Sequence, residues 1–143
     1  MEFVLHFCPK IAVYTNLSPD HLDRHGTMDE YVNMKMKMVK NMGDDGYIVF
    51  NADDPQLIMA LDGHDSKLAP FSMMRSGFIY SIDSKNINTL TGNPLLSVDD
   101  IALPGKHNLS NMLCAATSSS LMGISDKHIA TVSYTHLTLP TIA

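Results

Sequence analysis

The first half of the chain alternates short apolar runs with stretches of helical spacing. Residues 11–16 and 47–50 each have the pattern of a short buried strand. Between them, apolar residues recur at helical spacing, which predicts a helix over residues 28–42. After the second run, two acids and Pro55 suit the first turn of a short helix that ends near Leu61. This order predicts an α/β fold, with a parallel sheet and flanking helices.

The second half of the chain changes character after Gly63. A further short strand is predicted near residues 68–71. Three β-like runs follow at residues 78–82, 87–90 and 95–98, separated by turn-forming residues. They predict a small antiparallel β meander beside the parallel sheet. A last helix is predicted at about residues 108–122, closed by Gly123.

The helix predicted from residue 28 contains one lysine in an unusual place. Thr27 and Glu30 have the spacing of a capping box, which marks the start of the helix. Lys35 falls near the middle of the apolar stripe. On pattern alone, its stem could pack while its amine reaches water, or its amine could be directed at the loop before the helix. The other side of the helix is polar, with Asn33, Lys37, Lys40 and Asn41.

The loop before this helix is dense in ionisable side chains: Asp20, His21, Asp23, Arg24 and His25. Ligand sites in open α/β sheets lie beyond the carboxyl ends of the strands, which is where this loop begins. His21 could bind a metal ion through a ring nitrogen, or it could hydrogen-bond a neighbouring carboxylate. The spacing alone does not separate these two interpretations.

Two more polar segments stand beside predicted helices. NADD at residues 51–54 follows the second strand, and it could act only as a cap for the next helix. In GKHNLSN at residues 105–111, Asn108 is a candidate cap for the last helix. His107 and Asn111 stand four residues apart and therefore face the same way.

These segments together resemble the Mur ligase family. The first block is NLSPDHLDRHG at residues 16–26, followed by Tyr31-x-x-x-Lys35, and the two later segments follow in the family's order. The resemblance covers roughly residues 1–131. The sequence of residues 19–26 is most similar to that of family members that add D-glutamate.

The resemblance implies an activity as well as a fold. Mur ligases use ATP to add amino acids to the peptidoglycan precursor, and their central ATP-binding domain contains a small antiparallel sheet. The parent enzyme would join D-glutamate to the UDP-linked muramoyl precursor, UDP-N-acetylmuramoyl-L-alanine. ATP would phosphorylate the precursor's carboxylate, and the amine of the amino acid would then attack the acyl phosphate. The implied cofactors are ATP and Mg²⁺, and a cytoplasmic monomer is expected.

The resemblance also assigns roles to individual residues. His21 matches a histidine that binds Mg²⁺, and Lys35 matches a lysine that CO₂ converts to a carbamate. These two are the implied catalytic and metal-binding residues. The segment from residue 107 matches one that packs on adenine, a task that suits amide donors and acceptors. The implied nucleotide-binding residues are His107, Asn108, Asn111, Asn51 and Asp54.

Composition limits the partners. The formal net charge is −5, which argues against a nucleic-acid partner held by general electrostatics. No apolar run approaches the roughly 20 residues needed to span a bilayer, so no membrane partner is expected. Cys8 and Cys114 have no Cys-x-x-Cys spacing and are expected to be buried thiols in a reducing compartment.

The chain departs from the family pattern towards both ends. It contains no G-x-x-x-x-G-K-[ST] phosphate loop, so we expect a partial central domain over residues 1–131 that is inactive alone. Residues 132–143 resemble a translated sequencing adapter and are expected to form a non-native, loosely attached tail. Three alternatives stay open: a sibling Mur ligase, a folylpolyglutamate-type ligase, and a non-catalytic nucleotide-binding remnant.

Overall fold

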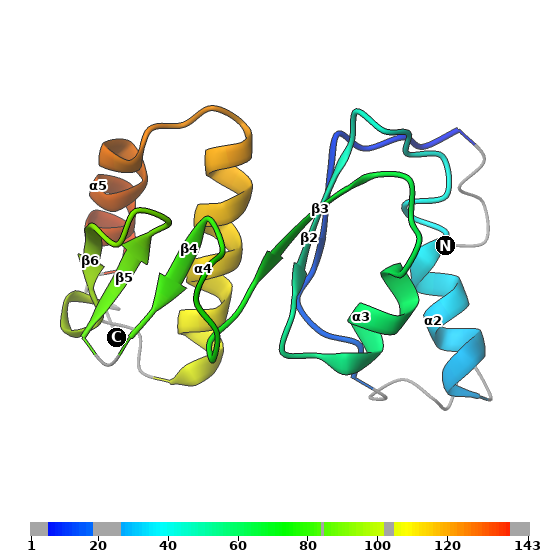
Figure 1. The fold of residues 1–143 in the computed structure, drawn as a ribbon, viewed down its shortest axis with the longest axis horizontal. Helices are drawn as coiled ribbons and strands as arrows, with labels where there is room; N and C mark the ends of the chain where they lie inside the picture. Colours follow the sequence, from blue (N-terminus) through cyan, green and yellow to red (C-terminus); the bar gives the residue numbers. More distant parts are fainter. Residues whose placement is uncertain (1–5, 19–26, 84, 102–104, 138–143) are drawn as a thin grey trace, which may run out of the picture. The chain divides into compact units, whose positions relative to one another are not determined.

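The computed structural model describes residues 6–18, 27–83, 85–101 and 105–137, with the side chains of 135–137 excepted. The chain divides into two compact units, Met1–Pro70 and Phe71–Ala143. The first unit contains the helices and strands of the predicted parallel sheet, and the second contains the meander and two further helices (Figure 1).

The parallel sheet has three strands: β1 (Ile11–Tyr14), β2 (Tyr47–Asn51) and β3 (Lys67–Phe71), in the order β1-β2-β3. β1 and β2 run parallel, as predicted, with Ile11 opposite Tyr47. The three middle residues of β2 are all buried, which is the pattern of a central strand covered on both faces. Helices α2 (Met28–Met36) and α3 (Pro55–Leu61) lie on one side of this sheet (Figure 1).

The predicted start of α2 is confirmed, but its predicted length is wrong. Thr27 accepts a hydrogen bond from the Glu30 N–H, and the Glu30 carboxylate accepts one from the Thr27 N–H. The helix ends at Met36 rather than Met42. The next residues form tighter turns, in which Val39 donates to the Met36 carbonyl and Met42 to the Val39 carbonyl.

These turns keep the apolar stripe of the sequence inside the first unit. Met36, Val39 and Met42 stand three residues apart, a spacing that fits both an α-helix and a 3₁₀ turn, so the pattern could not separate them. The buried core of the unit includes Ala12, Tyr14, Leu17, Tyr31, Val39, Met42, Ile48, Val49, Phe50, Ala52, Leu57, Leu61 and Ala69.

The predicted meander is confirmed in the second unit. Its strands are β4 (Tyr80–Ile82), β5 (Asn86–Thr89) and β6 (Pro94–Ser97), paired antiparallel in that order. A short 3₁₀ turn, η1 (Val98–Asp100), follows β6 and was not predicted. The α/β fold class, a parallel sheet with helices plus an antiparallel sheet, is therefore confirmed.

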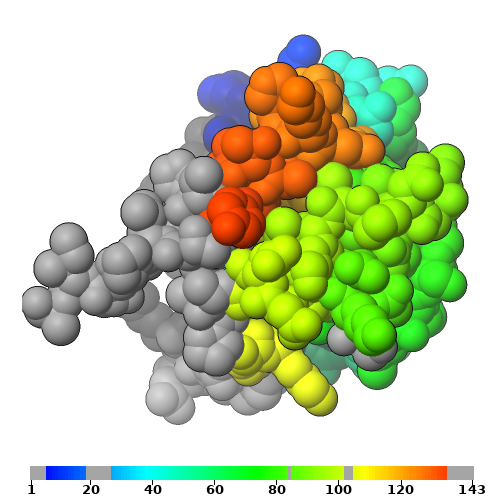
Figure 2. All heavy atoms as spheres, turned by 90° about the vertical axis from the view of Figure 1, so that its left-hand side faces the viewer, coloured from blue at the N-terminus to red at the C-terminus, as the bar shows by residue number. Residues whose placement is uncertain are grey.

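Two helices complete the second unit. Helix α4 (Lys106–Leu121) contacts β4 and helix α5 (Asp126–Leu137), and α5 contacts β6. Figure 2 shows α5, in orange, next to the yellow-green strands of the meander. Gly123 has a φ of 82° just after α4, which fits the predicted closing role. The predicted cap, Asn108, lies inside the helix instead, because α4 begins at Lys106 with Gly105 as its N-cap.

Helix α5 departs from the expectation for the end of the chain. Residues 132–137 continue this helix, rather than forming the loose tail that the sequence suggested, whereas residues 138–143 lie outside the described residues. Val132 and Tyr134 are exposed, and Ile129 is the buried anchor of the helix. None of the described side chains of residues 132–134 is buried, so this part of α5 adds little to the core.

The two cysteines differ from each other. Cys114 is buried in α4 as predicted, and burial raises the pKa of its thiol. Cys8 is exposed, so the expectation of two buried thiols is wrong for this residue. No helix in the described residues is long and apolar enough to cross a membrane.

Candidate functional site

Two loops leave the parallel sheet at the same edge. Tyr14, the last residue of β1, pairs with Phe50 near the end of β2. The segments that follow the two strands, residues 15–18 and 51–54, therefore begin close together. This is the edge at which ligand sites of open α/β sheets form.

Asp54 joins these two segments through both oxygens of its carboxylate. Oδ1 accepts a hydrogen bond from the Gln56 N–H at 2.9 Å and so caps α3. Oδ2 accepts one from the Leu17 N–H at 2.8 Å. Leu17 is buried. Asp54 thus acts as the helix cap that its position suggested, and it also fixes the segment after β1 against the start of α3.

Asn51 shapes the same edge. Its Oδ1 accepts a hydrogen bond from the Asp53 N–H at 2.9 Å, which closes a tight turn between β2 and α3. The side chain is half-buried, and its Nδ2 has no partner in the described part of the chain. Asn51 therefore offers an amide donor at the edge where the two loops meet.

Lys35 lies in line with two buried residues, one in α2 and one in the turns that follow it. Tyr31 and Val39, four residues to either side of Lys35, are buried, whereas Lys35 itself is half-buried. Its ammonium nitrogen stands 5.4 Å from the centre of the Tyr31 ring. Because Tyr31 is one turn nearer the start of α2, the Lys35 side chain extends toward the amino end of the helix. From the sequence, the Lys35 amine could reach water or could be directed at the loop before α2. The half-buried side chain fits either interpretation.

Tyr14 fixes α2 against the carboxyl end of β1, a role that the sequence did not indicate. Its hydroxyl donates a hydrogen bond to the Lys35 carbonyl at 2.9 Å. Burial raises the pKa of Tyr14 to about 12, so the hydroxyl stays protonated and remains a donor at neutral pH. The only signal in the sequence was a phenol within a buried apolar run, since a buried tyrosine hydroxyl generally needs a partner.

The charged loop itself lies outside the described residues. Residues 19–26 include His21 and the ionisable residues around it. The predicted approach of the Lys35 amine to His21 therefore stays a prediction. Among the residues that are described, no group of three His, Cys, Asp or Glu side chains is placed to hold a metal ion.

The remaining predicted residues share the first turns of α4, in the second unit. His107 and Asn111 are exposed and stand one helical turn apart on one face. Asn108 is half-buried, and its N–H donates to the Gly105 carbonyl at 3.1 Å. An imidazole and an amide on one exposed face can offer both donors and acceptors to a planar heterocycle.

Comparison with protein families gives a match over most of the chain. Residues 3–119 match the family described as Mur ligase middle domain. Among curated proteins, the UDP-N-acetylmuramoylalanine–D-glutamate ligase of Shouchella clausii is 36% identical over 132 residues, which cover 86% of this chain and 27% of that protein. The corresponding ligase of Bacillus cereus is 39% identical over 127 residues, covering 88% of this chain and 28% of that protein. The chain thus spans less than a third of the length of these relatives.

Solved structures agree on the fold. The ligase for UDP-N-acetylmuramate and L-alanyl-γ-D-glutamyl-meso-diaminopimelate from Neisseria meningitides superposes with a TM-score of 0.72 and 19% identity, over 89% of this chain and 40% of that one. A UDP-N-acetylmuramoyl-L-alanyl-D-glutamate–2,6-diaminopimelate ligase gives a TM-score of 0.70 and 22% identity, over 87% of this chain and 28% of that one. At these identities the likeness concerns the fold alone.

Proposed function

Because the chain belongs to the Mur ligase family through its middle domain, we propose that it serves an ATP-dependent ligase that joins D-glutamate to UDP-N-acetylmuramoyl-L-alanine. The choice of D-glutamate rests on the sequence identities of 36% and 39% to two UDP-N-acetylmuramoylalanine–D-glutamate ligases. The superposed structures include ligases for other amino acids at lower identity, so they support the fold and not the substrate. The activity is proposed for the whole enzyme, of which this chain would be the middle domain.

The proposed reaction has two steps. An oxygen of the precursor's carboxylate attacks the γ-phosphorus of ATP, which gives an acyl phosphate and releases ADP. The amine of D-glutamate then attacks the acyl carbon, phosphate leaves, and the nitrogen loses a proton to give the amide. The protein's task in both steps is to position the reactants and to neutralise phosphate charge.

Lys35 and His21 would hold Mg²⁺ in this enzyme. A neutral Lys35 amine forms a bond to the carbon of CO₂ and releases a proton, which leaves a carbamate anion on a long arm. Carbamate oxygens are hard ligands of the kind that Mg²⁺ prefers. The half-buried position of Lys35, with its side chain extending toward the start of α2, supports this assignment. The ion would supply charge neutralisation at the phosphate oxygens.

ATP would be bound by the other predicted residues. We assign the adenine to His107, Asn108 and Asn111 in the first turns of α4, where the exposed imidazole and amide groups fit a purine edge. Asn51 would contribute its amide N–H₂ group, which has no partner among the described residues, at the sheet edge. Both carboxylate oxygens of Asp54 accept hydrogen bonds from backbone N–H groups. Its proposed role is therefore to hold the segment after β1 against the start of α3.

The test of the metal assignment uses the whole ligase. Lys35→Ala should lower D-glutamate-dependent ADP release severely, and added formate or acetate should restore part of it by replacing the carbamate. Lys10→Ala is the matched control, because Lys10 is an exposed lysine of the same unit. Equal losses in the two variants, or no rescue of Lys35→Ala, would contradict the assignment.

The choice of substrate needs a separate assay. The wild-type ligase should release ADP with D-glutamate and the UDP-linked precursor, but not with diaminopimelate or with folate and glutamate. Activity with one of these instead would favour a sibling or a folylpolyglutamate-type ligase. We further propose that the 143-residue chain alone has no turnover, since its sequence contains no phosphate-loop motif. Phosphate release above background by the chain alone would refute this.

A further inference from the structure

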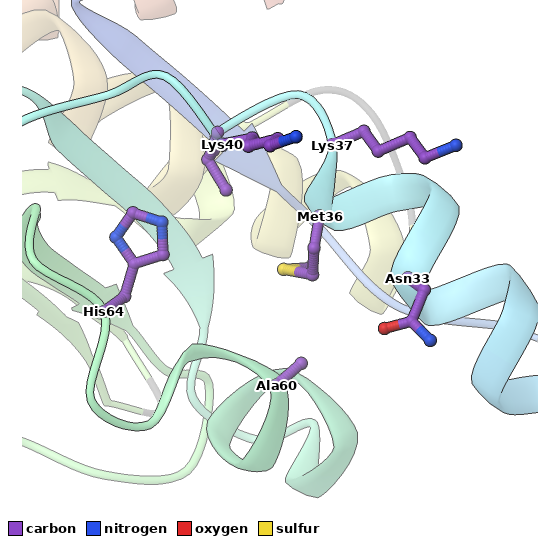
Figure 3. Close-up of a pocket in the computed structure, with 7 residues that line it drawn as sticks. Asn33, Met36, Lys37, Lys40, Ala60 and His64 are labelled. Atoms are coloured by element: carbon purple, nitrogen blue, oxygen red, sulfur yellow. The ribbon is translucent and has the colours of Figure 1, made fainter. Parts of the chain in front are cut away.

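The first unit contains a cavity whose described lining includes none of the proposed ligase residues. It has a volume of about 270 Å³ and is lined by Asn33, Met36, Lys37, Val39, Lys40, Ala60 and His64. Figure 3 shows Met36, Ala60 and His64 around one space between the end of α2, the end of α3 and the loop that follows α3, whereas the Lys37 side chain extends away from it. Among the described residues, the cavity therefore shares none with the proposed ATP and Mg²⁺ site.

The early end of α2 creates one wall of the cavity. Lys37 closes the helix by donating to the Asn33 carbonyl, and Lys40 then donates to the Lys37 carbonyl in a tighter turn. The polar side of the predicted helix, with Asn33, Lys37 and Lys40, thereby borders the cavity. A core function explains only Val39, which is buried, because Asn33, Lys37 and Lys40 are exposed.

The lining combines an apolar interior with a rim of hydrogen-bond donors. Met36, Val39 and Ala60 supply apolar surface, and Figure 3 shows the Met36 thioether directed into the space between α2 and α3. Asn33, Lys40 and His64 supply nitrogen donors, whereas Figure 3 shows the Lys37 side chain extending away from Met36 and His64. No carboxylate is among the described lining residues. Lys37 and Lys40 form no ion pair within the described part of the chain. Such a lining favours an anion that also has an apolar group.

His64 is held in one tautomer and one place. Its Nδ1 accepts a hydrogen bond from the Ser66 N–H at 3.1 Å, so in the neutral ring the proton lies on Nε2. Figure 3 shows one ring nitrogen facing the side of the cavity on which Lys40 lies. The loop is fixed by the buried Ser66, whose hydroxyl donates to the Gly43 carbonyl at 3.0 Å. His64 is therefore a pre-positioned donor.

We propose that this cavity binds the phosphate monoester of a small apolar alcohol. The Lys40 ammonium, an imidazole N–H and an amide can share the charge of a phosphate dianion. The volume leaves room beside the phosphate for a group of about the size of a benzene ring, against Met36, Val39 and Ala60. Asp62 and Asp65, the acids nearest to His64 in sequence, are exposed and do not line the cavity.

The binding test uses the ¹⁵N-labelled 143-residue chain and phenyl phosphate at physiological salt. The amide signals of Asn33, Lys37, Lys40 and His64 should shift and saturate together. Inorganic phosphate should bind at least about tenfold more weakly, because it lacks the apolar group, and phenol should bind weakly because it lacks the charge. If phenol matches phenyl phosphate, or if phosphate does, the proposal is wrong.

Two substitutions locate the site. Lys40→Ala and His64→Asn should each weaken phenyl phosphate binding by about tenfold. Asparagine can still accept the Ser66 N–H bond, so His64→Asn removes the donor while keeping the loop in place. Lys10→Ala makes the same charge change outside the cavity and should alter binding less than twofold. An equal effect of Lys10→Ala and Lys40→Ala would show general charge attraction and overturn the proposal.

Discussion

Replacing Asp54 removes two backbone hydrogen bonds from one carboxylate. The Gln56 N–H at 2.9 Å loses its cap, and the Leu17 N–H at 2.8 Å loses its only described partner. Asp54→Ala removes both bonds. Asp54→Asn keeps one acceptor oxygen for the cap but turns an N–H₂ group toward the Leu17 N–H, so it loses only the bond to Leu17. The two variants therefore separate the cap from the link between loops.

The expected losses follow from these two bonds. A helix cap contributes about 1 kcal/mol, and a hydrogen bond to a charged group contributes about 1.5–3 kcal/mol. We expect Asp54→Ala to lower the free energy of unfolding by about 3 kcal/mol and Asp54→Asn by about 2 kcal/mol. For a chain of this length, about 3 kcal/mol corresponds to a fall of about 10 °C in Tm.

The assay should resolve the first unit, since the chain divides into two units that need not unfold together. Amide hydrogen exchange does this residue by residue. The Leu17 amide should lose protection in both variants, whereas the Gln56 amide should lose it only in Asp54→Ala. Asp62→Ala, which changes an exposed acid at the end of α3, should stay within about 0.5 kcal/mol of the wild type. Loss of protection at neither amide would refute the reasoning.

Two more predictions concern pH and backbone strain. Burial raises the pKa of Tyr14 and Tyr80 from 10.0 to about 12, so the stability that they contribute is full below pH 10 and is lost as the pH rises through 12. An ultraviolet titration should show two late tyrosines; a single transition near pH 10 would contradict this. Gly105 has a φ of 114°, so Gly105→Ala should cost about 1–3 kcal/mol in urea unfolding. Gly43→Ala meets ordinary contacts and should be tolerated, and equal losses would refute the strain.

The elements that local chemistry specifies were predictable. The capping box at Thr27 and the acid before Pro55 mark helix starts through bonds between near neighbours in sequence. α5 was not predicted because residues 132–143 resemble a translated sequencing adapter and were expected to form a loose tail. Residues 132–137 instead continue a helix that contacts α4 and β6.

The candidate site was predictable only where family blocks mark it. The positions of Asn51, Lys35 and Asn111 follow from motifs, and the structure places each at an element end or on an exposed or half-buried face. The contacts that connect them do not follow from motifs. Asp54 and Leu17 are far apart in sequence, as are Tyr14 and Lys35, and no spacing rule predicts such long-range bonds.

The register of the two sheets has a consequence for the order of folding. Ile11 pairs with Tyr47 in the parallel sheet, whereas Ile82 pairs with Ile87 in the meander. The first separation is roughly seven times the second, which makes closing the parallel pair about 2 kcal/mol more costly in chain entropy. We therefore expect the hairpins of the meander to form within microseconds and the pairing of β1 with β2 to come later. On the ribosome, β1 is made before β2, so the pairing of Ile11–Tyr14 with β2 must wait until residues 47–51 have left the exit tunnel.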